Sequence, residues 1–202
     1  MFTGIVQTKR QIKSVKNLIG LKKFKIDFDQ RLLKNLKKGA SVAVDGVCLT
    51  VTNIDKNLVS FDLMNETLNK TTLGNFKKGN LVNIERSFKV NDEIGGHRVS
   101  GHVSGIVQII KIEKSPNNIK MVFKIDKYFM KYIFQKGFIS LNGCSLTIVD
   151  VDREANAFSI NFIPETLKVT TFGNKMVGDL VNLEIENQTQ IIVDTVERII
   201  GH

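Results

Sequence analysis

The stretch Val44-Asp45-Gly46-Val47-Cys48-Leu49-Thr50-Val51 occurs a second time in the chain, as Leu141-Asn142-Gly143-Cys144-Ser145-Leu146-Thr147-Ile148. Each copy has an apolar start, an acid or amide, a glycine and, two residues after the glycine, Cys or Ser followed by Leu, Thr and a β-branched residue. This pattern predicts an apolar strand that bends at the glycine and leaves as a second strand with a small nucleophilic side chain. A repeat of this kind bears on the whole architecture, so it is considered before any single element.

The repeat covers most of the 202-residue chain. The offset between matching residues changes little, from 97 (145 − 48) to 101 (105 − 4). A period of about 100 residues is too long for a solenoid and is a usual size for a domain. We therefore expect two domains of one fold that arose by duplication. The further matching pairs are Met1–Val6 with His102–Val107, Lys38-Gly39 with Lys136-Gly137, Asp62–Leu68 with Asn161–Leu167, Thr71–Asn75 with Thr170–Asn174, and Gly79–Glu85 with Gly178–Glu184.

Hydrophobic periodicity predicts short strands and a few helical turns. Residues 21–28 alternate between apolar and polar side chains, as in a half-buried strand. Residues 29–38 carry three leucines at helical spacing before Gly39, which predicts a short helix with a copy at 127–136. About six short strands in each half favour a closed barrel, because closure removes strand edges. Further strands are expected at 1–6, 41–45, 47–53, 58–64 and 80–87, a second helix at 66–73, and hairpin turns at 53–57 and 152–156.

The last residues of the chain predict an amphipathic helix. Ile192, Val196, Ile199 and Ile200 lie at helical spacing and form one apolar face. Little of the chain is left to cover that face, so we expect it to seek a partner chain.

Composition limits the class of protein. The formal net charge is +9, but the lysines are dispersed and there is no Trp, which favours a solvated surface over a nucleic-acid site. No apolar run is long enough to span a bilayer. Lys9, Arg10 and Lys13 follow the first apolar residues directly, unlike a signal peptide. We expect a cytoplasmic protein with two reduced thiols and no membrane or nucleic-acid partner.

Cys48 and Ser145 are the first candidates for chemistry, because both follow the glycine bend at the same place in the repeat. Thr50 and Thr147 lie two residues further on and so share a strand face with them. The alternative for Cys48 is a buried structural thiol, the usual state of a free cysteine. Cys144 aligns with Val47 and not with Cys48, so the cysteines are not a duplicated metal site, and no metal is expected.

His102 is the second kind of candidate, because histidine transfers protons near neutral pH. It follows Gly101 in a glycine-flanked turn. His97 lies between Gly96 and Arg98 and stays open as an alternative, and a packed or surface histidine is the more frequent case for either residue. Glu66-Thr67 and its copy Glu165-Thr166 offer an acceptor and a hydroxyl twice, although a helix-start signature explains them equally well. Two similar but not identical pockets, one in each half of the chain, indicate a paired ligand or one pseudo-symmetric ligand.

With these residues in view, the chain resembles the riboflavin synthase family of the alpha-chain type, in order and over essentially its whole length. The resemblance implies an all-β fold of two tandem six-stranded Greek-key β-barrels, with short helices and a C-terminal helix that assembles a homotrimer. It divides the chain into lumazine-binding barrels at 1–97 and 98–188 and an oligomerisation helix at 189–202. The motifs that carry it are Met1–Val6, Gly46–Val51, Ser60–Met64, Gly95-Gly96-His97, Ser100-Gly101-His102 and Ile163–Leu167.

The resemblance also implies a reaction. Two molecules of 6,7-dimethyl-8-ribityllumazine dismutate into riboflavin and 5-amino-6-ribitylamino-uracil as a four-carbon unit passes from donor to acceptor, without a metal or redox cofactor. The two substrates are held between facing barrels of neighbouring subunits. Lumazine synthase is a further implied partner.

The resemblance assigns residues to the site by position. His102 would handle protons, Cys48 and Ser145 would orient or polarise the two pteridines, and Thr147 is the fourth catalytic residue. The first barrel's binding residues are Ser41, Cys48, Leu49, Thr50, Asp62, Leu63, Met64, Asn65, Glu66 and Thr67, completed by Gly101, His102 and Val103. Those of the second are Lys136, Ser145, Leu146, Thr147, Asn161, Phe162, Ile163, Pro164, Glu165 and Thr166, completed by Gly4, Ile5 and Val6. Glu186 stands where relatives carry Asp, and its carboxylate is one methylene further from the backbone.

Two alternatives stay open. A lumazine-binding antenna protein would share the double barrel without turnover, but the presence of Cys48, His102, Ser145 and Thr147 favours the enzyme. A basic barrel that binds single-stranded nucleic acid would need exposed aromatic side chains, and the chain has two Tyr and no Trp.

Overall fold

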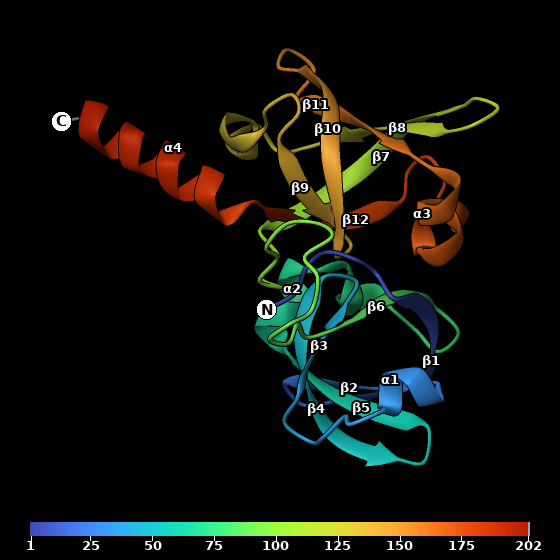
Figure 1. The fold of residues 1–202 in the computed structure, drawn as a ribbon. Helices are drawn as coiled ribbons and strands as arrows, with labels where there is room; N and C mark the ends of the chain where they lie inside the picture. The colour runs from blue at the N-terminus through green and yellow to red at the C-terminus, as the bar shows by residue number, and fades with distance from the viewer. Residues whose placement is uncertain (202) are drawn as a thin grey trace.

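The computed structural model describes residues 1–201 and contains two closed antiparallel β-barrels of six strands each, one above the other (Figure 1). His202, the last residue of the predicted oligomerisation helix, lies outside the described residues. The first barrel comprises β1 (Thr8–Leu18), β2 (Leu21–Asp27), β3 (Ser41–Val44), β4 (Val47–Asp55), β5 (Leu58–Met64) and β6 (Leu81–Arg86). The second comprises β7 (Gly105–Lys114), β8 (Ile119–Lys124), β9 (Phe138–Leu141), β10 (Cys144–Asp152), β11 (Ala157–Phe162) and β12 (Leu180–Ile185).

Both barrels have the same strand order. In the first, the closed order is β1-β2-β5-β4-β3-β6, and the second repeats it with β7 to β12. The hairpin-connected strands β3, β4 and β5 are followed by β6, which returns to pair with β3, so the connection is a Greek key. The all-β double barrel predicted from the sequence is therefore confirmed.

Each barrel has its own apolar core. The first is built around fully buried Phe24 and Phe61 with β-branched residues of the other strands. The second contains an aromatic cluster in which the Phe162 and Phe172 rings lie 4.5 Å apart between centroids. Along β4 and β10, core side chains alternate with outward-facing ones, as the period of a strand requires.

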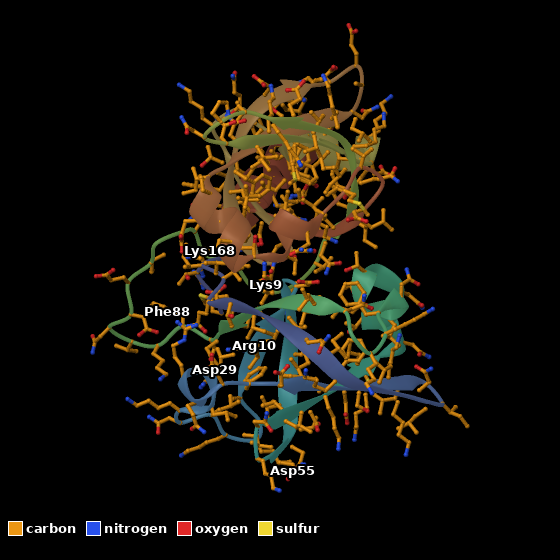
Figure 2. The ribbon with its side chains drawn as sticks, turned by 90° about the vertical axis from the view of Figure 1, so that its right-hand side faces the viewer. Lys9, Arg10, Asp29, Asp55, Phe88 and Lys168 are labelled. Atoms are coloured by element: carbon orange, nitrogen blue, oxygen red, sulfur yellow. The ribbon has the colours of Figure 1, made fainter. Side chains whose placement is uncertain are left out.

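Short helices connect the strands. They are α1 (Gln30–Leu33), α2 (Asn65–Lys70) and α3 (Pro164–Val169), with 3₁₀ turns η1 (Thr72–Asn75), η2 (Lys127–Tyr132) and η3 (Thr171–Asn174). Asp29 accepts a hydrogen bond from Leu32 N and so caps α1, and it also pairs with Arg10 of β1 (Figure 2).

Some predicted boundaries are wrong. The helix expected over 29–38 ends at Leu33, because Asn35 takes a left-handed backbone with φ of 58°. Its copy at 127–136 is the shorter 3₁₀ turn η2. The hairpin turn expected at 53–57 is confined to two residues, since β4 continues to Asp55 and β5 starts at Leu58. The prediction of a strand at 1–6 is also wrong: Phe2 forms an isolated bridge with Val99, and β1 begins at Thr8.

The barrels meet back to back at the two glycine bends. A Cβ atom added to Gly46 would lie 2.5 Å from the backbone nitrogen of Gly143, and both glycines have φ of 77°. Asn83 and Asn182 bond across this contact: the Asn83 side chain donates to the Asn142 carbonyl at 3.0 Å, and that of Asn182 donates to the Asp45 carbonyl at 2.9 Å. The repeated stretch is thus the pseudo-twofold contact between the domains.

The C-terminal helix α4 (Asn187–Ile200) extends away from the second barrel (Figure 1). Glu186 caps it by accepting from Gln188 N at 2.9 Å and Thr189 N at 2.7 Å. Hydrogen bonds from Tyr132 to Asp194 and from Lys131 to Glu197 tie the helix to η2. The predicted apolar face is exposed: Ile192, Val196, Ile199 and Ile200 are 47 to 77 % exposed. Within residues 1–201, no helix has both the length and the apolar character needed to cross a membrane.

Candidate active site

Cys48 and Ser145 occupy equivalent places on the outer faces of the two barrels. Along β4, Cys48 and Thr50 face outward, whereas Leu49 is buried in the core. Along β10, Ser145 and Thr147 face outward in the same way. The prediction that each nucleophilic side chain shares a strand face with its threonine is confirmed.

A backbone arm covers each of these residues. We call residues 1–6 the first arm and residues 98–103 the second arm. The carbonyl of Gly4 accepts from Ser145 N at 2.7 Å, and that of Gly101 accepts from Cys48 N at 2.9 Å. Both glycines have positive φ, and a Cβ on either would lie 2.6 Å from the Cβ of the residue it covers. Only glycine allows this approach, so each arm lies directly over a nucleophilic side chain.

These contacts correct the alignment of the repeat. Gly4 is equivalent to Gly101, at the same offset of 97 that separates Cys48 from Ser145 (101 − 4 and 145 − 48). The sequence had paired Gly4 with Gly105 and Met1 with His102. The residue of the first arm that corresponds to His102 is Ile5. The asymmetry is thus His102 on the arm that covers Cys48 and Ile5 on the arm that covers Ser145.

Lys136 is shifted by one residue in the same way. Its N–H donates to the carbonyl of Ile148, and the N–H of Gly39 donates to that of Val51, both at 2.8 Å. Lys136 therefore corresponds to Gly39 and not to Lys38, and both have positive φ. Its exposed side chain has no counterpart in the first barrel.

His97 contacts Ser145 directly. Its Nδ1 lies 2.6 Å from the Ser145 Oγ, and its ring stacks on Phe138 with centroids 5.4 Å apart. Burial lowers the pKa of His97, against an opposing effect of Glu186. Burial therefore favours the neutral imidazole, and in the tautomer protonated at Nε2 its Nδ1 can accept the proton of the Ser145 hydroxyl. From the sequence, His97 was only an alternative to His102, because its position next to a glycine does not indicate a partner on a distant strand.

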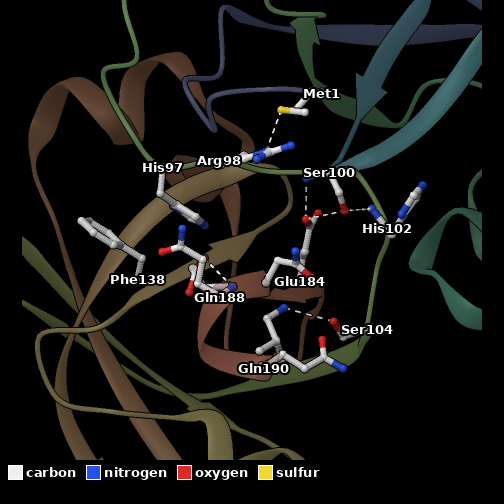
Figure 3. Close-up of a pocket in the computed structure, with 13 residues that line it drawn as sticks. Met1, His97, Arg98, Ser100, His102, Ser104, Phe138, Glu184, Gln188 and Gln190 are labelled. Atoms are coloured by element: carbon white, nitrogen blue, oxygen red, sulfur yellow. Dashed lines mark hydrogen bonds between the residues drawn. The ribbon is translucent and has the colours of Figure 1, made fainter. Parts of the chain in front are cut away.

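Both histidines line one cavity of about 640 Å³ (Figure 3). His102 is exposed, and its backbone N–H donates to the Ser100 hydroxyl at 3.0 Å. The cavity lies between the second arm, Phe138 and the start of α4, and Glu186 is part of its wall. Its lining does not include Cys48, Ser145, Thr50 or Thr147.

The other predicted site residues fall into two groups. The side chains of Leu49, Leu63, Leu146 and Phe162 point into the barrel cores, so only their backbone can meet a ligand. On the outer faces, Ser41 pairs with Thr50 between β3 and β4. The remaining residues at the ends of β5 and β11 and in the first turns of α2 and α3 are partly or fully exposed: Asp62, Met64, Asn65, Glu66, Thr67, Asn161, Ile163, Pro164, Glu165 and Thr166.

Two acidic side chains of the predicted site already have partners. Asp62 lies 3.3 Å from Lys23 Nζ and accepts from Thr52 at 3.4 Å. Glu66 pairs with Lys70 one turn along α2, at 2.9 Å. The helix-start explanation fits the position of Glu66, which lies in the first turn of α2 after Asn65.

The double barrel and its paired outer faces define a protein with two lumazine-binding domains. The family model described as "Lumazine binding domain" matches residues 3–87 and again residues 100–186. The solved structure titled "Crystal structure of LumP complexed with riboflavin" superposes with a TM-score of 0.86 at 28 % identity, over 93 % of this chain and 100 % of that one.

Curated relatives narrow the family. The riboflavin synthase of Escherichia coli (strain K12) is 48 % identical over 100 % of this chain and 94 % of its own. That of Buchnera aphidicola subsp. Schizaphis graminum is 47 % identical over 99 % and 96 %, and that of Chlamydia pneumoniae is 42 % identical over 100 % and 98 %. The chain belongs to the riboflavin synthase family.

Proposed function

We propose that the chain is a transferase that converts two molecules of 6,7-dimethyl-8-ribityllumazine into riboflavin and 5-amino-6-ribitylamino-uracil. The observation that carries the proposal is the pair of equivalent outer-face sites, each with a nucleophilic side chain and a threonine under a glycine arm. The full-length similarity to riboflavin synthases supports it. No cofactor is part of the proposal.

The duplication suits a reaction of two identical substrates. Holding both molecules in register removes most of the entropic cost of a bimolecular step. On the outer faces Thr50 and Thr147 are exposed, while Cys48 and Ser145 are half-buried under the arms, which suits sites completed by a second subunit. The proposal therefore includes a homotrimer assembled through the exposed apolar face of α4, with active sites between subunits.

The reaction requires two kinds of activation. The 7-methyl group of the acceptor must lose a proton, and the donor must be activated at ring carbon 7. The pair of Ser145 and His97 combines a hydroxyl with a neutral base at 2.6 Å, so it is suited to proton transfer or to activation of an adding nucleophile. In this scheme His102 handles protons beside Cys48, and Cys48 and Thr147 orient or polarise the pteridines.

The remaining binding assignments follow from these faces. The residues at the ends of β5 and β11, together with Ser41 and Lys136, would supply hydrogen bonds to the substrates, and the core-facing residues would contribute through their backbone. Glu186 would act through α4, which it caps, and through His97. The two free cysteines support a reducing cytoplasmic location, where association with lumazine synthase would deliver the substrate.

The likeness to LumP favours a second candidate, a lumazine- or flavin-binding protein without turnover. Mixing the purified protein with 6,7-dimethyl-8-ribityllumazine and following riboflavin absorbance distinguishes the two. The enzyme is expected to form riboflavin over many turnovers. Tight binding without riboflavin would leave the second candidate, and the absence of binding would refute both.

A further inference from the structure

Glu85, at the end of β6, holds the first arm. Its carboxylate accepts three hydrogen bonds, from Thr3 N at 2.7 Å, Thr3 Oγ1 at 2.8 Å and Gly4 N at 3.1 Å. Glu85 belongs to the first barrel, yet the carbonyl of the same Gly4 accepts from Ser145 N in the second barrel.

Glu184, at the end of β12, holds the second arm in the same way (Figure 3). It accepts from Ser100 N at 2.6 Å, Ser100 Oγ at 2.7 Å and Gly101 N at 2.9 Å. Glu184 belongs to the second barrel, and the Gly101 carbonyl accepts from Cys48 N in the first. Each carboxylate therefore binds the glycine that covers the nucleophilic side chain of the opposite barrel.

We infer that Glu85 and Glu184 are positioning residues that act across the barrels: Glu85 sets the arm over Ser145, and Glu184 sets the arm that covers Cys48 and carries His102. The inference rests on the proposed function for its catalytic meaning, although the cross-barrel coupling itself can be measured without turnover.

The chemistry of the two contacts requires a carboxylate. Three N–H and O–H donors converge on each acidic side chain, and a carboxylate offers only acceptors. Both residues are at least nine-tenths buried, and burial raises their pKa while the donated bonds oppose the rise. The His102 charge also opposes the rise at Glu184. Glutamine would turn an NH₂ donor toward one of the arm donors, so the arm would have to move.

The consequences for the two sites differ, because the arms carry different residues. Release of the second arm displaces His102 and uncovers Cys48, whose Cβ lies close to Gly101. Release of the first arm displaces Ile5 and uncovers Ser145. A residue that only stabilised the fold would not distinguish between the two sites.

The test compares Glu184→Gln with its matched control Glu85→Gln, both in a Cys144→Val background. Val is the residue at the equivalent position 47, and Cys144 is buried in the core, so Cys48 is then the one thiol. The rate at which a water-soluble thiol reagent labels Cys48 is expected to rise about ten-fold or more in Glu184→Gln and to change less than about two-fold in Glu85→Gln. Equal acceleration in both variants, or none in Glu184→Gln, would overturn the inference.

Two further variants keep the test decisive if Glu184→Gln does not fold. Ser100→Ala removes one donor and leaves the carboxylate in place, so it is expected to accelerate labelling by several-fold. Ser100→Thr introduces the residue that stands at the equivalent position 3 and is expected to restore the slow rate. Unchanged labelling in Ser100→Ala would count against the inference.

Steady-state kinetics adds the catalytic readout. Both Gln variants are expected to lower kcat about ten-fold while KM for the lumazine changes less than about three-fold, because the arms position groups and add little binding. If the labelling rates change as expected but kcat does not fall, then the two glutamates only place the arms. That result would contradict the inference that they position catalytic groups.

Discussion

Asp45 and Asn142 occupy equivalent positions on either side of the pseudo-twofold contact, and only one of them can ionise. Both have φ of 44°, and each Oδ1 accepts from a backbone N–H, that of Asn83 at 2.7 Å and that of Asn182 at 2.8 Å. Burial raises the pKa of Asp45 to about 7, and its hydrogen bond to Asn83 and the charge of Lys175 oppose this rise only in part. Asp45 is therefore a titrating group at the glycine-bend contact, and its counterpart Asn142 is not.

Asp45→Asn should make stability less dependent on pH. A folded pKa of about 7, above the ordinary 3.8, means that the stability associated with protonated Asp45 is fully present below pH 3.8 and is lost as pH rises through 7. Because the variant lacks this titration, its stability relative to the parent should rise by about 4 kcal/mol between pH 4 and pH 8: it is expected to be less stable than the parent near pH 4 and more stable at pH 8, on the order of 2 kcal/mol in each case. This figure allows for an unpaired amide like Asn142 Nδ2, which has no hydrogen-bond partner within residues 1–201. Urea unfolding at the two pH values measures it. Asn142→Asp should make stability more dependent on pH. If Asp45→Asn changes the stability equally at both pH values, the raised pKa of Asp45 is contradicted.

Gly46→Ala should destabilise the protein more than its backbone conformation alone explains. The new Cβ would overlap the backbone of Gly143, so the barrels would have to separate. Gly79 is the matched control, because it also has positive φ but a Cβ there would meet no atom of residues 1–201 within 4 Å. We expect a cost of about 3 kcal/mol or more for Gly46→Ala and about 1 kcal/mol for Gly79→Ala in thermal or urea unfolding. Similar costs would mean that the contact is not tight.

His97→Ala and Ser145→Ala should slow turnover by similar factors, about 100-fold or more, because the two side chains act as one unit. The double variant is expected to be no slower than the slower single variant. Single-turnover measurements with saturating lumazine test this. Additive losses would show that the 2.6 Å contact is not used in the reaction.

His102→Ala should slow turnover far more than it weakens binding. His102 follows Gly101 on the arm that covers Cys48 and is exposed in a cavity large enough to admit a ligand, so its loss removes a proton-transfer group without disturbing the core. Ile5→Ala is the control at the equivalent position of the other arm, where there is no ionisable group. The comparison needs kcat together with lumazine affinity from fluorescence titration. Unchanged turnover would remove His102 from the mechanism.

Charge on the apolar face of α4 should dissociate the proposed trimer. Ile192→Asp with Ile199→Asp places two carboxylates on that exposed face and is expected to give a monomer in sedimentation velocity. Arg198→Asp introduces the same side chain at a polar position of the helix and should leave assembly intact. A parent protein that sediments as a monomer would contradict the proposed oligomer.

Periodicity in the sequence was enough to predict the barrels and the strand faces that Cys48 and Ser145 share with Thr50 and Thr147. It failed at the arms. Gly-Ile-Val occurs at both Gly4 and Gly105, so identity favoured an alignment that is four residues too long. The structure pairs Gly4 with Gly101 because the carboxylates of Glu85 and Glu184 hold those segments. The contact between His97 and Ser145 joins residues 48 positions apart, and no local pattern encodes it.

The crossed arms make the two halves of the duplication mutually dependent. A fragment of residues 1–97 would contain Cys48 without Gly101, and one of residues 98–188 would contain Ser145 without Gly4. Neither fragment could cover its own nucleophile, although each would keep the arm that the other lacks together with the carboxylate that holds it. An ancestral single barrel would therefore have needed the arm of a second copy to cover its nucleophilic side chain. Fusion of the two genes would have placed both arms in one chain.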